Sequence, residues 1–283
     1  MAEIWDLYTK YREKTGKEHI RGEQIPQGYY HLVVHVWIRN RQGQYLISQR
    51  AANRPTYPLM WECVGGSVLK GESSAEGAVR EVKEEVGITL DSSAGKRLFT
   101  KIRNTVDGKP CQDILDVWLF EYDGAPQLKQ ATTDEVADCK WMEPSEMKQL
   151  YDDGLFVPTL DYFFCAFEKI EPDYSGIIGK KVRGKIDRPL GSKHPKHPDI
   201  VYPINYGYVE GIIGGDEEEQ DVYVFGSEKP LSEFEGRVIK VFHRFNDTED
   251  KWIVSLDGYF LSDDRILGDI TFQEQFFYGK LYG

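Results

Sequence analysis

Three glutamates in the first half of the chain have a spacing that suits metal binding. Glu81, Glu84 and Glu85 stand at positions i, i+3 and i+4, which places their carboxylates on one face of a helix. Like charges this close repel each other unless a cation lies among them. Hard cations such as Mg²⁺ take oxygen ligands and often share them with the phosphates of a substrate. The pattern indicates either a magnesium site for phosphate chemistry or the solvated face of an amphipathic helix.

The residues around these glutamates fit a longer pattern. Arg80 precedes Glu84 by four residues, and Glu72 lies in a glycine-flanked loop. The segment matches the Nudix box, G-x5-E-x7-R-E-U-x-E-E-x-G-U with U apolar, at every position: Gly66, Glu72, Arg80, Glu81, Val82, Glu84, Glu85, Gly87 and Ile88. Seven fixed residues, each with a background of roughly 6%, give a chance match on the order of 10⁻⁹ per starting position. Residues 1–170 therefore resemble the Nudix hydrolases.

This resemblance implies an α/β/α sandwich that binds Mg²⁺ or Mn²⁺ and hydrolyses a small-molecule diphosphate, usually a nucleoside diphosphate linked to another moiety. It assigns metal binding to Glu81, Glu84, Glu85 and the carbonyl of Gly66, and the orientation of the glutamates to Glu72 and Arg80. Water would attack phosphorus in line while a carboxylate takes its proton. The base would be a box glutamate, such as Glu81 or Glu84, or a later one. Glu135 is the later candidate, and it fits an ordinary surface residue equally well.

An isomerase is the first alternative. The stretch WDLYTKYREKTG and the segment YYHLVVHVWI are also similar to the subgroup related to isopentenyl-diphosphate isomerase. That enzyme needs a cysteine after this strand and an altered box. Here the following segment reads RNRQGQYLISQR, without a cysteine, and the box is intact. Hydrolysis is therefore favoured over isomerisation.

A second group of carboxylates occurs in the last third of the chain, on two turns. The first turn carries Asp216, Glu218 and Asp221, and the second carries Asp247, Asp250 and Lys251. Acidic turns at the ends of neighbouring strands would form an oxygen-rich pocket for cations. Acidic residues are also common in turns for conformational reasons alone, so solvated turns remain an alternative.

Residues 177–278 resemble the family I inorganic pyrophosphatases, because IDRPLGS and YPINYGYV accompany these turns. The resemblance implies an OB-like β-barrel with a flanking helix, metal binding by the acidic turns, phosphate binding by Lys251 and an active-site tyrosine at Tyr206. Glu218 departs from the family pattern, which has aspartate there, and the early catalytic glutamate and arginine have no obvious counterparts. The domain is therefore either an active pyrophosphatase or a degenerate barrel, which could instead regulate the first domain.

The elements that position these residues follow from periodicity. Apolar residues three or four apart predict a helix from Ser73 to Val86, which Gly87 ends. Alternating β-branched and aromatic residues predict a hairpin over 28–50 and strands over 97–104 and 114–123. Further helices are expected over 144–151, 159–168 and 262–278, and 4–14 is either helix or strand. Proline and glycine near 171–176 predict domains of 1–172 and 173–283. The expected fold class is α/β, a Nudix sandwich followed by a small β-barrel.

Composition excludes several classes of protein. The formal net charge of −12 is divided evenly between the two halves, which argues against binding to a nucleic acid polymer. No apolar run approaches the roughly 20 residues that a membrane span needs. The charged, aromatic start does not resemble a signal peptide, and the 4 cysteines form no CxxC pair. A cytoplasmic location is expected. Nudix domains often form homodimers, which composition neither favours nor excludes.

Overall fold

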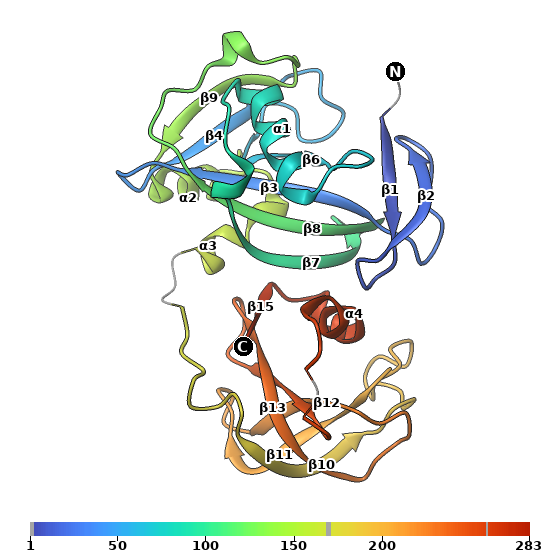
Figure 1. The fold of residues 1–283 in the computed structure, drawn as a ribbon. Coiled ribbons are helices and arrows are strands. Elements are labelled where there is room, and N and C mark those ends of the chain that lie inside the picture. Colours follow the sequence, from blue (N-terminus) through green and yellow to red (C-terminus); the bar gives the residue numbers. More distant parts are fainter. Residues whose placement is uncertain (1–2, 168–170, 259) are drawn as a thin grey trace. The chain divides into compact units, whose positions relative to one another are not determined.

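The chain folds into two units, each with its own core. The computed structural model describes residues 3–167, 171–258 and 260–283. The units are Met1–Phe164 and Cys165–Gly283 (Figure 1). The predicted boundary at residue 172 lies a few residues beyond this division and stays a prediction.

The first unit is built on a mixed sheet with a separate hairpin beside it. Its strands are β1 (Ile4–Tyr8), β2 (Lys14–Ile20), β3 (His31–Arg39), β4 (Tyr45–Arg50), β5 (Trp61–Glu62), β6 (Val64–Ser67), β7 (Lys96–Val106), β8 (Lys109–Glu121) and β9 (Val136–Met142). Strand β3 pairs in parallel with β8 and antiparallel with β6, so it lies at the centre of the sheet. The hairpin β1–β2 shows that residues 4–8 form a strand, one of the two predicted alternatives.

Helix α1 (Ser74–Val86) covers one face of this sheet, and the helix predicted over 73–86 is confirmed (Figure 1). Ser73 caps its first turn in a capping box with Glu76, and Gly87 ends it with a left-handed φ of 72°. The apolar side of the helix packs into the same core as the inward residues of β3 and β8. The polar side is therefore left to carry the box glutamates.

The opposite face of the sheet is covered by residues after β9. Helix α2 (Pro144–Asp152) agrees with the helix predicted over 144–151. The helix predicted over 159–168 is wrong over most of its length, since a 3₁₀ turn (Pro158–Leu160) and a short helix α3 (Phe163–Ala166) replace it. Its last residue, Glu168, lies outside the described residues. Tertiary contacts explain the difference, because Phe163 stacks on Trp37 with ring centroids 4.4 Å apart.

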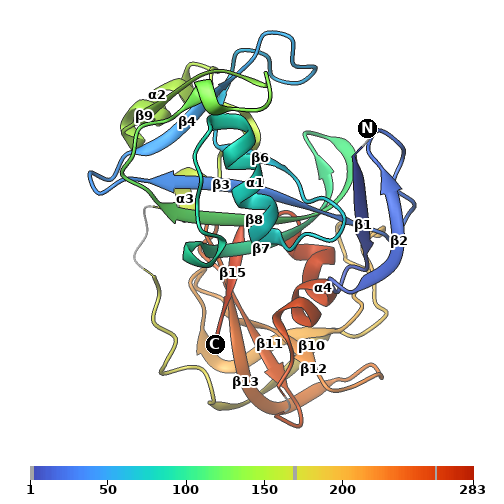
Figure 2. The same ribbon diagram turned by 45° about the horizontal axis from the view of Figure 1, so that its top comes forward.

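The second unit is a closed five-stranded barrel with a flanking helix. Its strands are β10 (Lys181–Arg188), β11 (Asn205–Ile213), β12 (Glu219–Phe225), β13 (Glu233–Arg244), β14 (Asp250–Ser255) and β15 (Gly279–Tyr282). The order β10-β11-β12-β14-β13 closes through pairing of β10 with β13, and β15 adds to β13 outside the ring. The predicted barrel is confirmed. Helix α4 (Asp263–Glu274) is shorter than the predicted 262–278, because the chain then turns into β15 (Figure 2).

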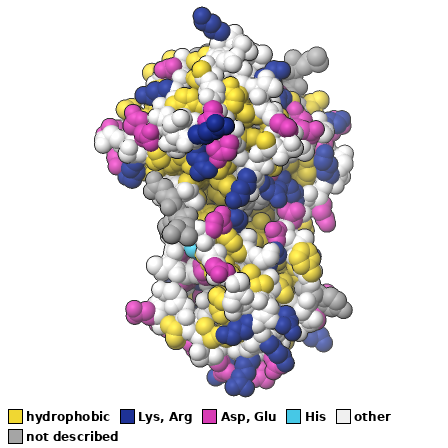
Figure 3. All heavy atoms as spheres, turned by 60° about the vertical axis from the view of Figure 1, so that its left-hand side comes forward, with side chains coloured by type: hydrophobic (Ala, Val, Ile, Leu, Met, Phe, Trp, Pro, Cys, Tyr) yellow, Lys and Arg dark blue, Asp and Glu magenta, His cyan; other side chains and the backbone are white. Residues whose placement is uncertain are grey.

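The surface carries both signs of charge. On the face shown in Figure 3, acidic and basic side chains are interspersed over both units. Within the described part of the chain, no helix combines the length and apolar character needed to span a bilayer.

Candidate active site

Arg80 binds three of the box carboxylates at once. Its Nε lies 2.8 Å from Oε1 of Glu72, and its Nη1 lies 2.9 Å from Oε1 of Glu81 and 2.8 Å from Oε2 of Glu84. Its Nη2 donates to the carbonyl of Ser67 at 2.8 Å. A guanidinium offers five donors in a fixed fork, so one side chain can fix several acceptors. Arg80 therefore holds the glutamates on one side of α1.

Glu81 lies directly against Gly66 in β6. A Cβ built on Gly66 would overlap the carboxylate of Glu81, so glycine is required for this close approach. Burial raises the pKa of Glu81 to about 7, although the charge and hydrogen bond of Arg80 act in the opposite direction. A carboxylate with a pKa near neutrality is suited to accept a proton at physiological pH.

Glu85 is a buried carboxylate without a hydrogen-bond donor. Its residue is 6% exposed, and none of the residues that the structure describes donates a hydrogen bond to it. Burial raises the pKa of Glu85 well above its ordinary value, and the nearby charges of Glu62, Glu81 and Glu135 raise it further. A buried charge of this kind is unfavourable unless it is paired or binds a metal. The surroundings of Glu85 therefore favour a cation.

Two further glutamates lie near this cluster, and the sequence predicted only one of them. Glu135, predicted as a base, lies near Glu85 and forms an ion pair with Arg54 at 2.6 Å. Glu62 was not predicted at all, and it forms an ion pair with Arg50 at 2.5 Å. Burial raises the pKa of Glu62 as well. Glu62 belongs to the two-residue strand β5 before the box, where no spacing distinguishes it, and only the pairing of β4 with β5 brings it beside Arg50.

The donor chemistry of this cluster fits a hard divalent cation. Throughout residues 3–167, 171–258 and 260–283, no three Asp, Glu, His or Cys side chains converge as ligands on one point. Glu81 and Glu84 are turned toward Arg80 instead. The oxygen-rich surroundings and the buried, unmatched carboxylate of Glu85 nevertheless suit Mg²⁺ or Mn²⁺. The residues are thus assembled near one another without a finished coordination geometry.

The second unit brings together part of the predicted cluster around Lys251. This lysine is only 1% exposed, and its Nζ binds Asp221, Glu249 and, at 3.0 Å, the hydroxyl of Tyr206. The Tyr206 hydroxyl also donates to Asp221 at 2.5 Å. Glu249 was not predicted, although it lies in the second acidic turn. It stands two residues before Lys251, and residues at this spacing in an extended chain lie on the same side, which is a signal that could have named it.

A small recess beside Lys251 is lined by four carboxylates. They are Asp216, Asp221, Glu249 and Asp250. The recess has no room for a water molecule in this conformation. Asp250 also accepts hydrogen bonds from Tyr174 at 2.5 Å and pairs with His243 at 2.7 Å. The carboxylates of this recess thus already have partners within the protein.

Two of the predicted residues lie elsewhere. Glu218 is exposed and does not line the recess, although its backbone N–H donates to Asp216 at 3.1 Å. Asp247 pairs with the buried Arg244 at 2.9 Å, and Arg244 also binds Glu274. The structure therefore assembles Asp216, Asp221 and Asp250 with Lys251 and Tyr206, but leaves Glu218 and Asp247 outside.

Comparison with known proteins identifies the first unit. The NUDIX domain family model matches residues 29–160. An uncharacterized Nudix hydrolase of Listeria monocytogenes is 40% identical over 57% of this chain and 90% of its own length. Nucleoside triphosphatase NudI of Salmonella agona is 32% identical over 39% and 79%, and isopentenyl-diphosphate Delta-isomerase of Corynebacterium diphtheriae is 25% identical over 41% and 66%. With its intact box folded around Arg80, the chain belongs to the Nudix hydrolases, which act on phosphoanhydride bonds.

Proposed function

We propose that the first unit is a Mg²⁺- or Mn²⁺-dependent hydrolase of a nucleoside diphosphate linked to another moiety. The observation that carries the metal dependence is the carboxylate of Glu85, which is buried beside Glu62, Glu81 and Glu135 without a donor. The link to nucleotides is supported by the similarity to a nucleoside triphosphatase.

The residues of the chain divide the work in this proposal. Glu81, Glu84, Glu85 and the carbonyl of Gly66 would hold the metal, which when bound offsets negative charge on the phosphate oxygens. Arg80 fixes the positions of Glu81 and Glu84, and Glu72 anchors Arg80 from the loop. The proton of the attacking water would pass to a carboxylate. Glu81, with its pKa of about 7, and Glu135, held by Arg54, are the two candidates.

Isomerisation remains the alternative reaction for this unit. A reactive cysteine requires an accessible thiolate. Cys63, beside the box, is 2% exposed, and burial raises the pKa of its thiol well above the ordinary value. This supports hydrolysis over isomerisation.

A second candidate function concerns the barrel. The cluster of Lys251, Tyr206 and Asp221 beside four carboxylates supports a phosphate-binding, pyrophosphatase-like activity. If the first unit releases pyrophosphate, an active barrel would cleave it to orthophosphate and draw the first reaction forward. The exposed Glu218 and the closed recess support instead a barrel without this activity, which could regulate the first unit.

One experiment tests both units in the full chain. A panel of nucleoside diphosphate-linked compounds and nucleoside triphosphates is incubated with Mg²⁺; nucleoside monophosphate is measured by chromatography, and phosphate is assayed with and without added pyrophosphatase. Formation of nucleoside monophosphate that depends on Mg²⁺ and is lost in Glu85→Gln supports the hydrolase. Pyrophosphate that accumulates only in Asp221→Asn supports an active barrel. Hydrolysis of no compound, with conversion of isopentenyl diphosphate seen by NMR, would overturn the proposal in favour of the isomerase.

A further inference from the structure

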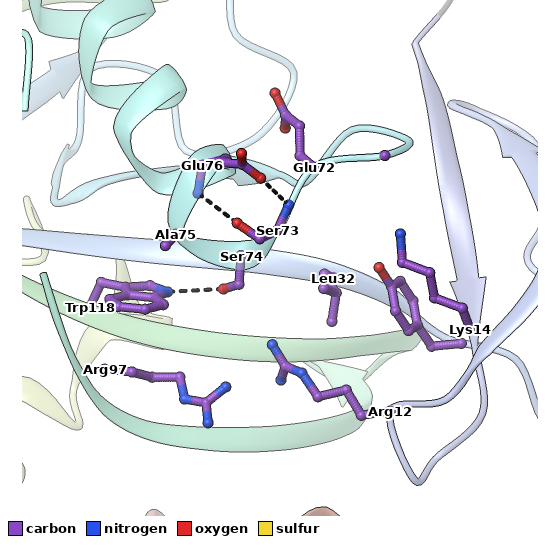
Figure 4. Close-up of a pocket in the computed structure, with 12 residues that line it drawn as sticks. Arg12, Lys14, Leu32, Glu72, Ser73, Ser74, Ala75, Glu76, Arg97 and Trp118 are labelled. Carbon is purple, nitrogen blue, oxygen red and sulfur yellow. Dashed lines mark hydrogen bonds between the residues drawn. The ribbon is translucent and has the colours of Figure 1, made fainter. Parts of the chain in front are cut away.

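A pocket of about 530 Å³ lies beside the N-terminus of α1, away from the metal-binding glutamates. It is formed by the β1–β2 hairpin, the loop before α1, and strands β7 and β8 (Figure 4). Glu72 is on its rim, whereas Glu81, Glu84 and Glu85 do not line it. Its volume is in the range of pockets that hold small organic ligands.

The charge of the pocket is set by two arginines that share one carboxylate. Asp116 is fully buried at its edge and accepts from Arg12 through both oxygens, one of them at 2.9 Å, and from Thr100 at 2.6 Å. Arg97 approaches the same Asp116 only to 3.7 Å. Arg12 thus forms a close ion pair with Asp116, whereas Arg97 makes only a long one.

Arg97 is the more accessible of the two arginines. Its side chain is 43% exposed and lines the pocket, and no described residue accepts a hydrogen bond from it. Among the other charged lining residues, Lys14 pairs with Asp6, Glu72 pairs with Arg80, and Glu76 accepts from the backbone N–H of Ser73. The donors of Arg97 are therefore available to a ligand.

The rest of the lining suits the organic part of a ligand. Trp118 and Leu32 lie along the pocket above Arg97 and Arg12, as Figure 4 shows. The Trp118 indole is fixed by its Nε1, which donates to the hydroxyl of Ser74 at 2.9 Å. An aromatic ring held in this way offers a preformed surface for a planar or sugar-like group.

We propose that this pocket binds a phosphate monoester of nucleotide size, with its phosphate on Arg97 and Arg12 and its organic part against Trp118. Guanidinium groups match phosphate through paired, charge-assisted hydrogen bonds. The site is separate from the carboxylates that would hold the metal. The inference thus goes beyond the proposed hydrolysis and does not depend on it.

The test is calorimetric titration of the full chain with AMP, adenosine and inorganic phosphate in EDTA, which removes metal-dependent binding. AMP is expected to bind more tightly than either fragment. Arg97→Gln should weaken AMP binding by about tenfold, the typical size of a lost charged hydrogen bond. The matched control is Lys96→Gln, which removes the same charge one position earlier on β7, outside the pocket, and should leave the affinity within about twofold.

Four results would overturn the proposal. The first is absence of AMP binding at millimolar concentration, and the second is equal affinity for adenosine and AMP. The third is an equal effect of Arg97→Gln and Lys96→Gln. The double variant Glu84→Gln/Glu85→Gln distinguishes this site from the catalytic one, because AMP affinity in EDTA should be unchanged there. A change of AMP affinity in that variant, in either direction, would place AMP at the box and would likewise reject the pocket.

Discussion

Both units gather carboxylates around one cationic side chain, but the two cationic side chains differ in how far they are exposed. In the first unit Arg80 is 20% exposed and binds Glu72, Glu81 and Glu84. In the second unit Lys251 is 1% exposed and binds Asp221 and Glu249. Carboxylates thus surround a partly accessible cationic side chain in one unit and a buried one in the other.

The two clusters also differ in whether every carboxylate has a hydrogen-bond donor. Each carboxylate of the barrel recess has a donor within the protein, whereas Glu85 has none among the described residues. A satisfied buried network contributes to folding, and an unsatisfied buried charge lowers stability until something binds it. The comparison teaches that a buried carboxylate is left without a donor at the box, whereas the carboxylates of the barrel cluster are paired within the protein.

The largest expected effect is on the stability of the barrel. Lys251→Met leaves Asp221 without its cation and leaves Glu249 with Arg244 alone, and breaking a buried pair in this way costs about 3–5 kcal/mol. Hydrogen exchange of the full chain in urea, read by mass spectrometry on peptides from residues 171–258 and 260–283, should show this loss of stability in the barrel. The matched control is Lys181→Met, whose ion pair with Glu235 is exposed on both sides, so its loss should cost under about 1 kcal/mol. Equal effects of the two variants would refute a structural role for the buried cluster.

The next effect is on hydrolysis. Glu85→Gln keeps the shape of the side chain and removes its charge, so the rate with Mg²⁺ should fall by about 10²–10³-fold. Addition of Mg²⁺ should raise the unfolding temperature of the wild-type chain but not that of the variant, because only the charged site gains from the ion. An undiminished rate would mean that the glutamates of α1 are not the metal site.

A smaller loss of activity is expected from crowding the glycine beside Glu81. Gly66→Ala places a methyl group where the carboxylate of Glu81 lies, which displaces it. A misplacement of about 1 Å can lower a rate by about 10²-fold. Gly176→Ala is the control, since a Cβ there meets open space. Steady-state rates of the two variants should differ clearly, and similar rates would show that the position of Glu81 is not critical.

The smallest effect concerns pH and stability without metal. Because the folded state raises the pKa of Glu85 above its ordinary 4.5, the charged form is disfavoured on folding. The contribution of Glu85 is therefore most favourable below pH 4.5 and is lost as pH rises. In EDTA, Glu85→Gln should be more stable than wild type by about 1–3 kcal/mol at neutral pH, with the gap closing toward acid pH. A gap independent of pH would contradict this origin.

The sequence predicted local features better than contacts between distant segments. The helix of the box was predicted almost to its ends, because capping residues and apolar spacing are both local signals. The segment after residue 158 was predicted wrongly, since Phe163 is placed by stacking on Trp37 rather than by helical periodicity.

The candidate sites show the same limit. Glu81, Glu84 and Glu85 could be named because one helix carries them. Glu62 could not, since strand pairing brings it to its cluster. Glu249 stands two residues before Lys251, and the alternation of an extended chain could have named it. A sequence motif identifies the site residues within it, whereas site residues from other segments can be identified only once the fold is known.

The ion pairs of Arg80 with Glu81 and Glu84 have a consequence for the affinity of the expected metal site. The guanidinium already donates a hydrogen bond to one oxygen of each of these two expected ligands. A metal ion that binds there must therefore compete with Arg80 for these oxygens. Such competition lowers affinity and makes the ion exchangeable instead of permanent. We expect the rate of turnover to depend on the concentration of free Mg²⁺, so that the supply of the ion would limit the reaction.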